Sequence, residues 1–291
     1  MLKKAYVEIT NICNLSCSFC HGASRAPAFM EPEDFRTAAN KLRPFTGYIY
    51  LHLLGEPLLH PKLEEILGIC SELDFKVTVV TNGTLIEKAA NTLLSCECLY
   101  KVGFSLHSFE ANNKNITLEE YLEPICRFAR VSSEKGVINV FRLWNGGAQN
   151  FLNEKILRII ESFETGDGSA SQKTNSANIG KTGSETQNRP LSQNIYLEFA
   201  DRFSWPDMGA NEENPRFCMG LRDQIGVLVD GTAVPCCLDA EGQIKLGNIF
   251  SESVESILGC ARAKNIVKGF SEGQACEELC RRCGFAKQRF G

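Results

Sequence analysis

Short apolar segments alternate with longer amphipathic segments over roughly the first 200 residues of the chain. The apolar segments are rich in Val, Ile, Phe and Tyr, as buried or half-buried strands are. They predict strands at Ala5–Thr10, Ile49–Leu54, Lys76–Thr81, Lys101–Leu106, Asn139–Trp144 and Ile195–Phe199. The amphipathic segments predict helices at Glu31–Arg43, Pro61–Leu73, Thr84–Ser95, Thr117–Glu134 and Asn150–Phe163. This alternation predicts an α/β fold with a parallel sheet and right-handed crossovers.

Two later regions break the alternation. Residues 165–192 consist mainly of Gly, Ser, Thr, Asn and Gln, which cannot bury enough apolar surface to offset their ordering entropy, so we expect a mobile insertion. After residue 214, two short apolar segments flank Asp230-Gly231, which predicts a hairpin, and a helix is expected over about Ser253–Lys264. We therefore expect two domains, at residues 1–205 and 214–291.

Composition places the chain among ordinary globular proteins. Of 291 residues, 43% are hydrophobic and 23% are charged, and the formal net charge is −4. The negative charge disfavours a nucleic-acid partner held by phosphate contacts. No signal-type apolar region and no run of about 18 apolar residues is present. We expect a cytoplasmic protein that neither spans nor binds a membrane.

The chain has 14 cysteines, and their distribution is uneven. Without an export signal, metal sites, catalysis or buried thiols are expected in preference to disulfides. One group lies near the start, at Cys13, Cys17 and Cys20, and another in the last quarter, at Cys218, Cys236, Cys237, Cys276, Cys280 and Cys283. The remaining five are expected to be buried, at Cys70, Cys96, Cys98, Cys126 and Cys260.

The first group has the spacing CxxxCxxC and directly follows the first predicted strand. In parallel α/β folds, active sites form at this end of the strands. Three thiolates on one loop can hold three irons of a [4Fe-4S] cluster and leave the fourth iron open to a small molecule. The spacing alone leaves two alternatives, which are a zinc site with His21 as a fourth ligand and simple buried thiols.

Neighbouring segments give the chain a resemblance to the radical S-adenosylmethionine (SAM) superfamily. They are the cysteine loop with Phe19 before its last cysteine, Gly55-Glu56-Pro57, Thr81-Asn82-Gly83, and Ser105 near the end of the fourth strand. The second segment resembles the Gly-Gly-Glu element of that family, with Leu54 in place of the first glycine. The resemblance covers roughly residues 5–200 in order and spacing.

The resemblance implies a partial (β/α)6 barrel in which Cys13, Cys17 and Cys20 ligate a SAM-binding [4Fe-4S] cluster. In that family the cluster passes one electron to the sulfonium of SAM, and the resulting 5′-deoxyadenosyl radical abstracts a hydrogen atom from the substrate. Such enzymes are oxygen-sensitive and take electrons from a donor such as flavodoxin or ferredoxin. The resemblance implies these SAM-contacting residues: Phe19, Gly55, Glu56, Pro57, Thr81, Asn82, Ser105 and Arg142.

Each assignment has a physical rationale. Glu56 can accept hydrogen bonds from the ammonium of the methionine moiety, and Gly55 lets the backbone approach the ligand closely. Arg142 on the fifth strand is the candidate cation for the carboxylate of SAM. Thr81, Asn82 and Ser105 are candidates for the ribose hydroxyls. Alternatively, Asn82-Gly83 is only a turn and Arg142 only part of an ordinary ion pair.

The later cysteines resemble SPASM and shorter twitch extensions of the family. Cys218, Cys236, Cys280 and Cys283 are expected to hold one auxiliary [4Fe-4S] cluster. Two alternatives stay open within this set, because Cys237 can replace Cys236 and Cys276 can join. A zinc site made of four cysteines is the rival reading.

The expected function is a radical SAM oxidoreductase that oxidises, dehydrogenates or crosslinks a peptide or a small polar metabolite. An RNA-modifying radical enzyme is the second possibility, and a zinc-stabilised binding module is the non-enzymatic one. Because no segment precedes the first strand, a built-in leader-peptide-binding module is not expected. His52 and His107 lie near strand ends, where they contact substrate or are satisfied core histidines.

Overall fold

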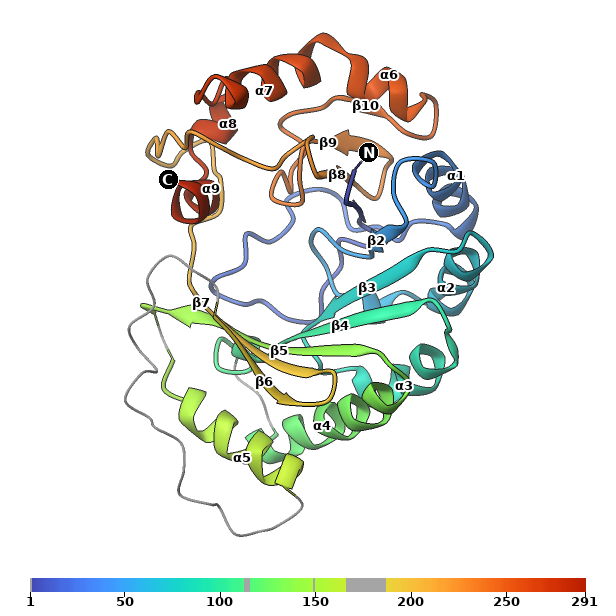
Figure 1. The fold of residues 1–291 in the computed structure, drawn as a ribbon, viewed down its shortest axis with the longest axis vertical. Coiled ribbons are helices and arrows are strands. Elements are labelled where there is room, and N and C mark those ends of the chain that lie inside the picture. Colours follow the sequence, from blue (N-terminus) through green and yellow to red (C-terminus); the bar gives the residue numbers. More distant parts are fainter. Residues whose placement is uncertain (1, 113–115, 149, 166–186) are drawn as a thin grey trace.

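The computed structural model describes residues 2–112, 116–148, 150–165 and 187–291. Its described strands form one ten-stranded sheet in the order β10-β9-β8-β1-β2-β3-β4-β5-β7-β6 (Figure 1). The strands are β1 Lys4–Val7, β2 Tyr48–Tyr50, β3 Lys76–Thr81, β4 Leu99–Ser105, β5 Ile138–Gly146, β6 Gln187–Ser192, β7 Ile195–Asp201, β8 Gln224–Val227, β9 Thr232–Val234 and β10 Gly247–Asn248.

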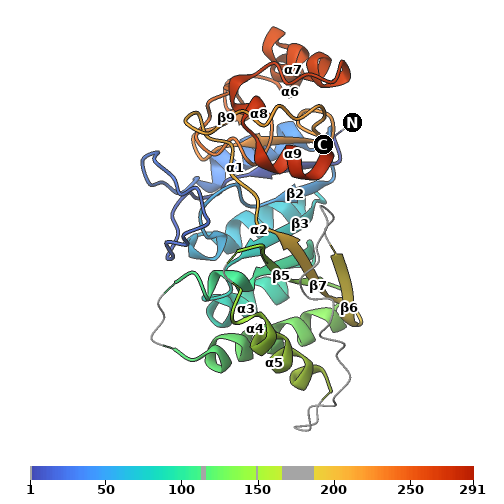
Figure 2. The ribbon, with the colours of Figure 1, turned by 90° about the vertical axis from the view of Figure 1, so that its left-hand side faces the viewer.

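The helices of the first half alternate with the strands. They are α1 Pro32–Leu42, α2 Leu63–Glu72, α3 Ile86–Ser95, α4 Leu118–Glu134 and α5 Asn153–Thr165, with short 3₁₀ turns η1 Pro57–Leu59 and η2 Leu106–Ser108. The later helices are α6 Val254–Gly259, α7 Ala261–Ser271, α8 Glu278–Arg281 and α9 Gly284–Phe290. Figure 2 shows the later helices at one end of the molecule and α4 and α5 at the other.

Six neighbouring pairs of this sheet are parallel. They are β8–β1, β1–β2, β2–β3, β3–β4, β4–β5 and β5–β7. Helices α1–α5 cover the outer side of this curved sheet (Figure 1). Because successive strand residues point to opposite faces, one set packs on the helices and the other lines the inner face. The observed architecture confirms the predicted α/β fold, with the parallel strands curved into a partial barrel.

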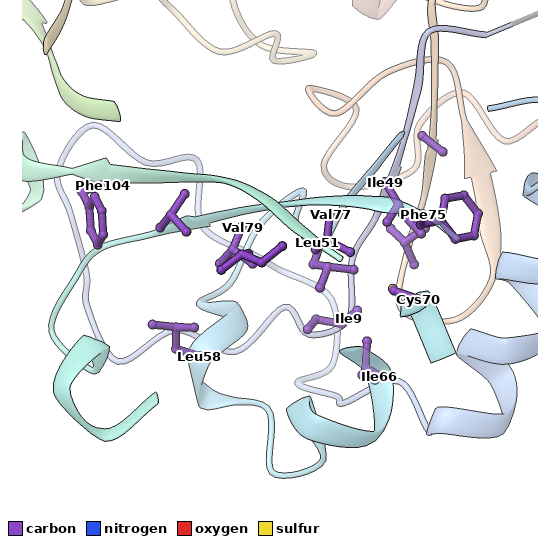
Figure 3. Close-up of a cluster of buried hydrophobic side chains, with 14 of the residues drawn as sticks. Ile9, Ile49, Leu51, Leu58, Ile66, Cys70, Phe75, Val77, Val79 and Phe104 are labelled. Carbon is purple, nitrogen blue, oxygen red and sulfur yellow. The ribbon is translucent and has the colours of Figure 1, made fainter. Parts of the chain in front are cut away.

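The core lies between the sheet and its covering helices. Ile49, Val77 and Val79 from the strands contact Ile66 and Cys70 from α2, and all five are almost fully buried (Figure 3). Burial of one such aliphatic side chain contributes about 1.5–3 kcal/mol, so this layer is a main source of stability. The β-branched residues of β3 suit the pleated, packed surface, and this explains why the short apolar segments of the sequence form strands.

The ends of some strands and helices differ from the predicted ones, mainly where the chain passes from a strand into a loop. Strands β1 and β2 end at Val7 and Tyr50, earlier than predicted, and the residues that follow turn into loops. The expected helix over Ser253–Lys264 is interrupted at Cys260, whose extended backbone ends α6 and begins α7. Its thiol accepts the backbone N–H of Ala263, so the break is itself a helix cap.

Part of the predicted mobile insertion is instead a strand. Residues 187–192 form β6, which pairs with β7 in antiparallel fashion, so that part of the prediction was wrong. Composition missed it because Pro190 and the polar residues around it are tolerated at a sheet edge, where the backbone supplies the hydrogen bonds. Residues 166–186 of the predicted insertion lie outside the described residues.

The C-terminal hairpin continues the barrel sheet. Strand β8 pairs in parallel with β1, with Ala5 opposite Ile225 and Val7 opposite Val227. The predicted hairpin at Asp230-Gly231 is present as β8 and β9, and β10 adds to its far side. The C-terminal segment thus covers one edge of the parallel sheet, and its Cys237 packs beside Tyr6 of β1.

Candidate functional site

The loop that carries Cys13, Cys17 and Cys20 runs from β1 to α1 at the carboxyl ends of the strands (Figure 1). Cys13 and Cys20 are exposed, and Cys17 is half-buried. The backbone N–H groups of Leu15 and Gly22 donate to the sulfurs of Cys13 and Cys20 at 3.4 and 3.5 Å. Such N–H···S contacts stabilise thiolates and are found around iron–sulfur clusters. The donor set therefore fits a cluster ligated by three cysteines.

Two asparagines hold the cysteine loop from neighbouring segments. Asn112 donates to Cys17 Sγ at 3.0 Å and accepts the backbone N–H of Ser16, also at 3.0 Å. Asn82 donates to Asn14 Oδ1 at 2.9 Å and lies 3.8 Å from Cys13 Sγ. These contacts fix the loop against the ends of β3 and β4.

Glu56 links the loop after β2 to the loop after β3. Its carboxylate accepts the backbone N–H groups of Leu58 at 3.1 Å and Asn82 at 2.7 Å, and its side chain is only 1% exposed. Burial raises the pKa of Glu56 to about 7, although these hydrogen bonds act in the opposite direction. The structure thus places both oxygens on backbone groups, and contact with a SAM ammonium remains a prediction.

Gly55 has a backbone conformation that favours glycine. Its φ angle is +74°, and a Cβ at this position would overlap the carbonyl oxygen of Thr10. Pro57 begins the buried 3₁₀ turn η1 that follows. The two residues therefore set the path of the chain beside the cysteine loop, which is compatible with the predicted close approach to a ligand.

The other predicted SAM contacts differ in accessibility. Thr81 is buried and accepts the backbone N–H of Gly83 at 3.0 Å, and Asn82 Oδ1 accepts from Thr84. Ser105 is half-buried at the end of β4, next to Arg142 on β5 in the strand register. Arg142 Nε lies 3.3 Å from Glu198 Oε1, so it is part of an ion pair. Their roles towards SAM stay predictions.

A cavity of about 700 Å³ opens beside the cysteine loop. Its walls come from Phe19, from the end of β5, and from the segment after β7; the lining residues are Phe19, Gly146, Gly147, Ala148, Asp201, Arg202, Phe203, Ser204 and Trp205. Trp205 Nε1 donates to the carbonyl oxygen of Phe19 at 3.1 Å, which ties this wall to the cysteine loop. The size falls within the range of small-molecule sites.

His107 supports Phe19 from below. The two rings lie 4.7 Å apart between centroids, and His107 Nδ1 is 3.1 Å from the carbonyl oxygen of Arg142. Burial lowers the pKa of His107 to about 4, so the ring is neutral near pH 7. Of the two interpretations given for His107, substrate contact or a hydrogen-bonded core residue, these contacts favour the second. His52 is different, because its Nδ1 is buried without a hydrogen-bond partner among the described residues.

Five of the later cysteines, which we call the thiol group, influence one another's pKa: Cys218, Cys236, Cys237, Cys280 and Cys283. Burial, followed by the charges of Cys218, Cys237, Cys283 and Cys280, raises the pKa of Cys236, so these sulfurs are electrostatic neighbours. Burial likewise raises the pKa of Cys283 to about 12, with Cys218 again among the contributors. Four mutually close thiols would hold a cluster only as thiolates, and the metal would supply the stabilisation that their burial withholds.

Cys237 has neighbours on the inner face of the sheet in addition to the other thiols. It packs against the small apolar cluster of Tyr6, Leu53, Leu228 and Val234, and Lys4 and Tyr6 lower its pKa against the effect of burial. Cys276 is exposed. Cys236 as the fourth ligand, with Cys237 as its alternative, stays a prediction.

The alternative zinc sites gain no support. Within the described ranges, no group of three or more His, Cys, Asp or Glu side chains is placed to hold a single ion. His21, the fourth ligand in that reading, lies 3.8 Å from Glu241 instead. A cubane cluster spreads its thiolates over four metals, so its ligand sulfurs need not surround one point.

Some cysteines expected to be buried are only partly so. Cys70 and Cys126 are buried, as predicted, but Cys96, Cys98 and Cys260 are partly exposed. Cys96 and Cys98 face each other, with their sulfurs 2.8 Å apart. The prediction failed there because both lie in the short connection that leads into β4, outside the packed helix faces.

Comparison with known families identifies the protein class that this fold and site define. The family model described as the radical SAM superfamily matches residues 7–159, and the SPASM model, described as an iron–sulfur cluster-binding domain, matches residues 218–284. The chain belongs to the radical SAM superfamily and carries a SPASM domain. Membership implies SAM and a [4Fe-4S] cluster as cofactors, with auxiliary iron–sulfur binding in the SPASM part.

Sequence relatives have diverse names. The chain is 27% identical over 285 residues to a protein of Methanosarcina mazei named "Probable GTP 3′,8-cyclase", covering 88% of this chain and 84% of that one. It is 27% identical over 278 residues to the antilisterial bacteriocin subtilosin biosynthesis protein AlbA of Bacillus subtilis, covering 87% of this chain. The chain spans 58% of the length of AlbA. It spans 40% of the length of another relative, a Methanothermobacter marburgensis protein named "Probable GTP 3′,8-cyclase".

Three solved structures that share this fold are SuiB, BtrN and anSMEcpe. Streptococcus suis SuiB bound to S-adenosylmethionine superposes with a TM-score of 0.61 at 16% identity, covering 99% of this chain and 72% of SuiB. BtrN in complex with AdoMet and 2-DOIA gives 0.56 at 17% identity, covering 97% and 93%. The AdoMet-bound anSMEcpe gives 0.61 at 14% identity, covering 100% and 88%. Within the described part of this chain, no helix is long and apolar enough to cross a membrane.

Sequence reasoning missed the residues that hold the cysteine loop in place. Asn112 and Trp205 belong to no recognised motif, and Arg25 and Glu8 lie in segments whose sequence gives no sign of an ion pair. A usable signal existed at Phe203-Ser-Trp205, where two aromatic residues directly follow the last strand of the parallel series. The partners of Asn112 depend on long-range packing, which a single sequence does not display.

Proposed function

We propose that this protein is a SAM-cleaving oxidoreductase whose substrate is a peptide or a small polar metabolite. The observation that carries the proposal is the cavity lined by Phe19, which lies in the loop that bears Cys13, Cys17 and Cys20. Active sites of parallel α/β proteins form at this end of the strands. When bound, a [4Fe-4S] cluster on Cys13, Cys17 and Cys20 would supply the electron for reductive cleavage of SAM.

The protein's own residues position this chemistry. Asn112 and Asn82 orient the cysteine loop, and Glu56 fixes the adjoining loops through buried hydrogen bonds. Phe19, Phe203 and Trp205 contribute aromatic rings to the cavity wall, beside the polar residues Asp201, Arg202 and Ser204. Arg142 remains the proposed partner of the SAM carboxylate, and Ser105 that of a ribose hydroxyl.

The auxiliary thiols support oxidation of the substrate as the reaction type. One cluster on Cys218, Cys236, Cys280 and Cys283 would accept an electron from the substrate after hydrogen abstraction. The neighbouring Cys237 and Tyr6 pack against each other on the inner face of the sheet, so the thiol group borders the barrel interior. A flavodoxin or ferredoxin is the proposed donor, and the cytoplasm the proposed compartment.

Anaerobic reconstitution followed by addition of SAM and dithionite tests the proposal. We expect 5′-deoxyadenosine and methionine, together with deuterium transfer from a deuterated substrate. Cys17→Ala should abolish 5′-deoxyadenosine formation, and Cys96→Ser, at a thiol remote from the loop, serves as the matched control. Undiminished 5′-deoxyadenosine formation by Cys17→Ala would refute the assignment, as would zinc as the sole metal of oxygen-protected protein.

A further inference from the structure

Four basic side chains gather on the inner face of the sheet, below the cavity. Lys4 on β1, Lys101 on β4 and Arg142 on β5 point to the face opposite the helices, and His52 follows β2 on the same face. The Arg142 guanidinium contributes to lowering the pKa of Lys4, Lys101 and His52, after burial as the main cause. These groups are therefore electrostatic neighbours although they come from four different strands or strand ends.

The lysines of this group lack acidic partners. Among the described residues, no carboxylate oxygen lies within 4 Å of the ammonium of Lys4 or Lys101. The acids Asp223, Glu8 and Glu198 form ion pairs with Lys3, Arg25 and Arg142 instead. Lys4 Nζ instead lies over the rings of Tyr6 and Tyr50, at 5.2 and 5.1 Å from their centroids. Partly buried ammonium groups without a counter-charge are unfavourable, so a ligand that supplies negative charge would stabilise them.

The acids near this group are already engaged. Glu198 Oε1 accepts Trp144 Nε1 at 2.8 Å and lies 3.3 Å from Arg142 Nε. Asp223, which raises the pKa of Lys4 slightly, accepts Lys3 Nζ at 2.7 Å. Among the described residues, Glu198 is thus the carboxylate beside both Lys101 and Arg142, and Asp223, the acid near Lys4, is paired with Lys3. The carboxylate of SAM would neutralise a single cation, and Arg142 suffices for it.

Unsatisfied polar atoms point to the same place. His52 Nδ1 and Arg142 Nε are buried and lack a hydrogen-bond partner among the described residues, since the Arg142–Glu198 pair does not have hydrogen-bond geometry. Burial and the neighbouring cations lower the pKa of His52 to about 3, so its ring is neutral near pH 7 and can donate through one nitrogen. Buried polar atoms are normally paired, so orphaned ones mark a site for a ligand or water.

We propose that Lys4, Lys101 and His52 form a binding site for an anionic group of the substrate, a carboxylate or a phosphate, beside Arg142, which is left to the carboxylate of SAM. This inference rests on the proposed function and names the substrate class for it. Arg142 and Gly146, which lines the cavity, are four residues apart on β5, or about 13 Å along a strand. A substrate held through its anionic end thus extends its other end towards the cavity.

The experiment measures anion binding directly, on anaerobically reconstituted full-length protein. Inorganic phosphate and malonate are the probes, and ligand NMR relaxation gives the dissociation constant of each. We expect the wild-type protein to bind at least one probe at millimolar concentration. Lys101→Met and Lys4→Met should each weaken binding about tenfold, because each removes one charge while keeping an apolar stem. The tighter of the two probes identifies the chemistry of the anion.

A matched control comes from the same sheet. Lys76 Nζ also lies over two tyrosine rings, those of Tyr48 and Tyr100 at 5.5 and 5.4 Å, but its side chain is exposed. Lys76→Met should leave anion binding unchanged. Equal weakening by Lys76→Met and Lys101→Met would show non-specific attraction and overturn the proposal. If either test variant does not fold, as judged by circular dichroism, the other gives the same comparison.

Two further outcomes are decisive. No binding of either probe to the wild-type protein would overturn the proposal, and so would displacement of a bound probe by SAM, because the SAM carboxylate would then occupy the site. Neither outcome depends on SAM cleavage. Failure of the proposed function is read separately, from the absence of 5′-deoxyadenosine in the wild-type reaction.

Discussion

Arg25 and Glu8 form a buried ion pair that joins the cysteine loop to the sheet. Arg25 Nη2 donates to Glu8 Oε1 at 2.7 Å, and the Glu8 side chain is fully buried. The other Glu8 oxygen accepts the backbone N–H of Val229 at 3.1 Å, and Arg25 Nε donates to the Ala240 carbonyl oxygen at 2.9 Å. One carboxylate therefore contacts both the segment after the cysteines and the C-terminal hairpin.

Removal of this carboxylate should be strongly destabilising. Glu8→Ala leaves Arg25 without its counter-charge and two backbone contacts unmade, so we expect a loss of about 3–5 kcal/mol in the free energy of unfolding. Anaerobic urea denaturation measures it. Glu31→Ala is the control, since Glu31 pairs with Lys62 at the surface and its loss should lower the free energy of unfolding far less. Similar losses in both variants would contradict the structural role of Glu8.

The buried carboxyl of Glu56 should make stability depend on pH. Its pKa is about 7 in the folded protein and near 4.5 when unfolded, so the folded state binds more protons between these values. The stabilisation is therefore complete below about pH 4.5 and is lost as pH rises through 7, by up to about 3 kcal/mol. Glu56→Gln should flatten this slope between pH 5 and 8 in urea titrations. An unchanged slope in the variant would assign the dependence to other groups.

Asn112 should tune the cluster that Cys17 is proposed to ligate. Its amide donates to Cys17 Sγ at 3.0 Å, and hydrogen bonds to ligand sulfur stabilise the reduced, more negative cluster. Asn112→Ala should therefore lower the reduction potential of the SAM-binding cluster, as followed by electron paramagnetic resonance in a redox titration. The auxiliary cluster in the same sample provides the internal reference. A shift of both potentials, or of neither, would argue against a local effect of Asn112.

The Cys96–Cys98 pair should be chemically reactive. The hydrogen bond with the Cys98 thiol, 2.8 Å away, lowers the pKa of Cys96 from its ordinary value, which favours the reactive thiolate at Cys96. We expect Cys96 to be the first non-ligand cysteine alkylated by iodoacetamide, as located by peptide mass spectrometry. Cys98→Ala removes the donor and should slow this alkylation roughly tenfold. The half-buried Cys260 is the comparison thiol, and equal rates at Cys96 and Cys260 would refute the prediction.

The sequence was sufficient for the order of strands and helices and for the family. Apolar periodicity located β3, β5 and the helices, because their side chains alternate between core and inner face. It misplaced the end of β1, where Glu8 turns from the sheet ladder to a buried ion pair. It also missed β6, whose strand character comes from backbone pairing with β7 and not from its side chains.

The site was predictable only as far as local motifs reach. The cysteine loop, Gly55 and Glu56 are contiguous signals with fixed spacing. The partners that hold them in place are distant in sequence, as with Asn112 and Cys17 or Trp205 and Phe19. The unpaired cations of the inner face depend on which strands become neighbours, so no spacing rule could have brought Lys4 and Lys101 together.

The parallel pairing of β1 with β8 bears on the order of folding during synthesis. A ribosome releases Lys4–Val7 more than 200 residues before it releases Gln224–Val227, so the nascent first strand has one open edge for most of translation. An unpaired apolar strand edge is a template for association with other chains. Stalled or prematurely terminated chains should consequently aggregate, and cells would need chaperones to shield this edge until the hairpin emerges.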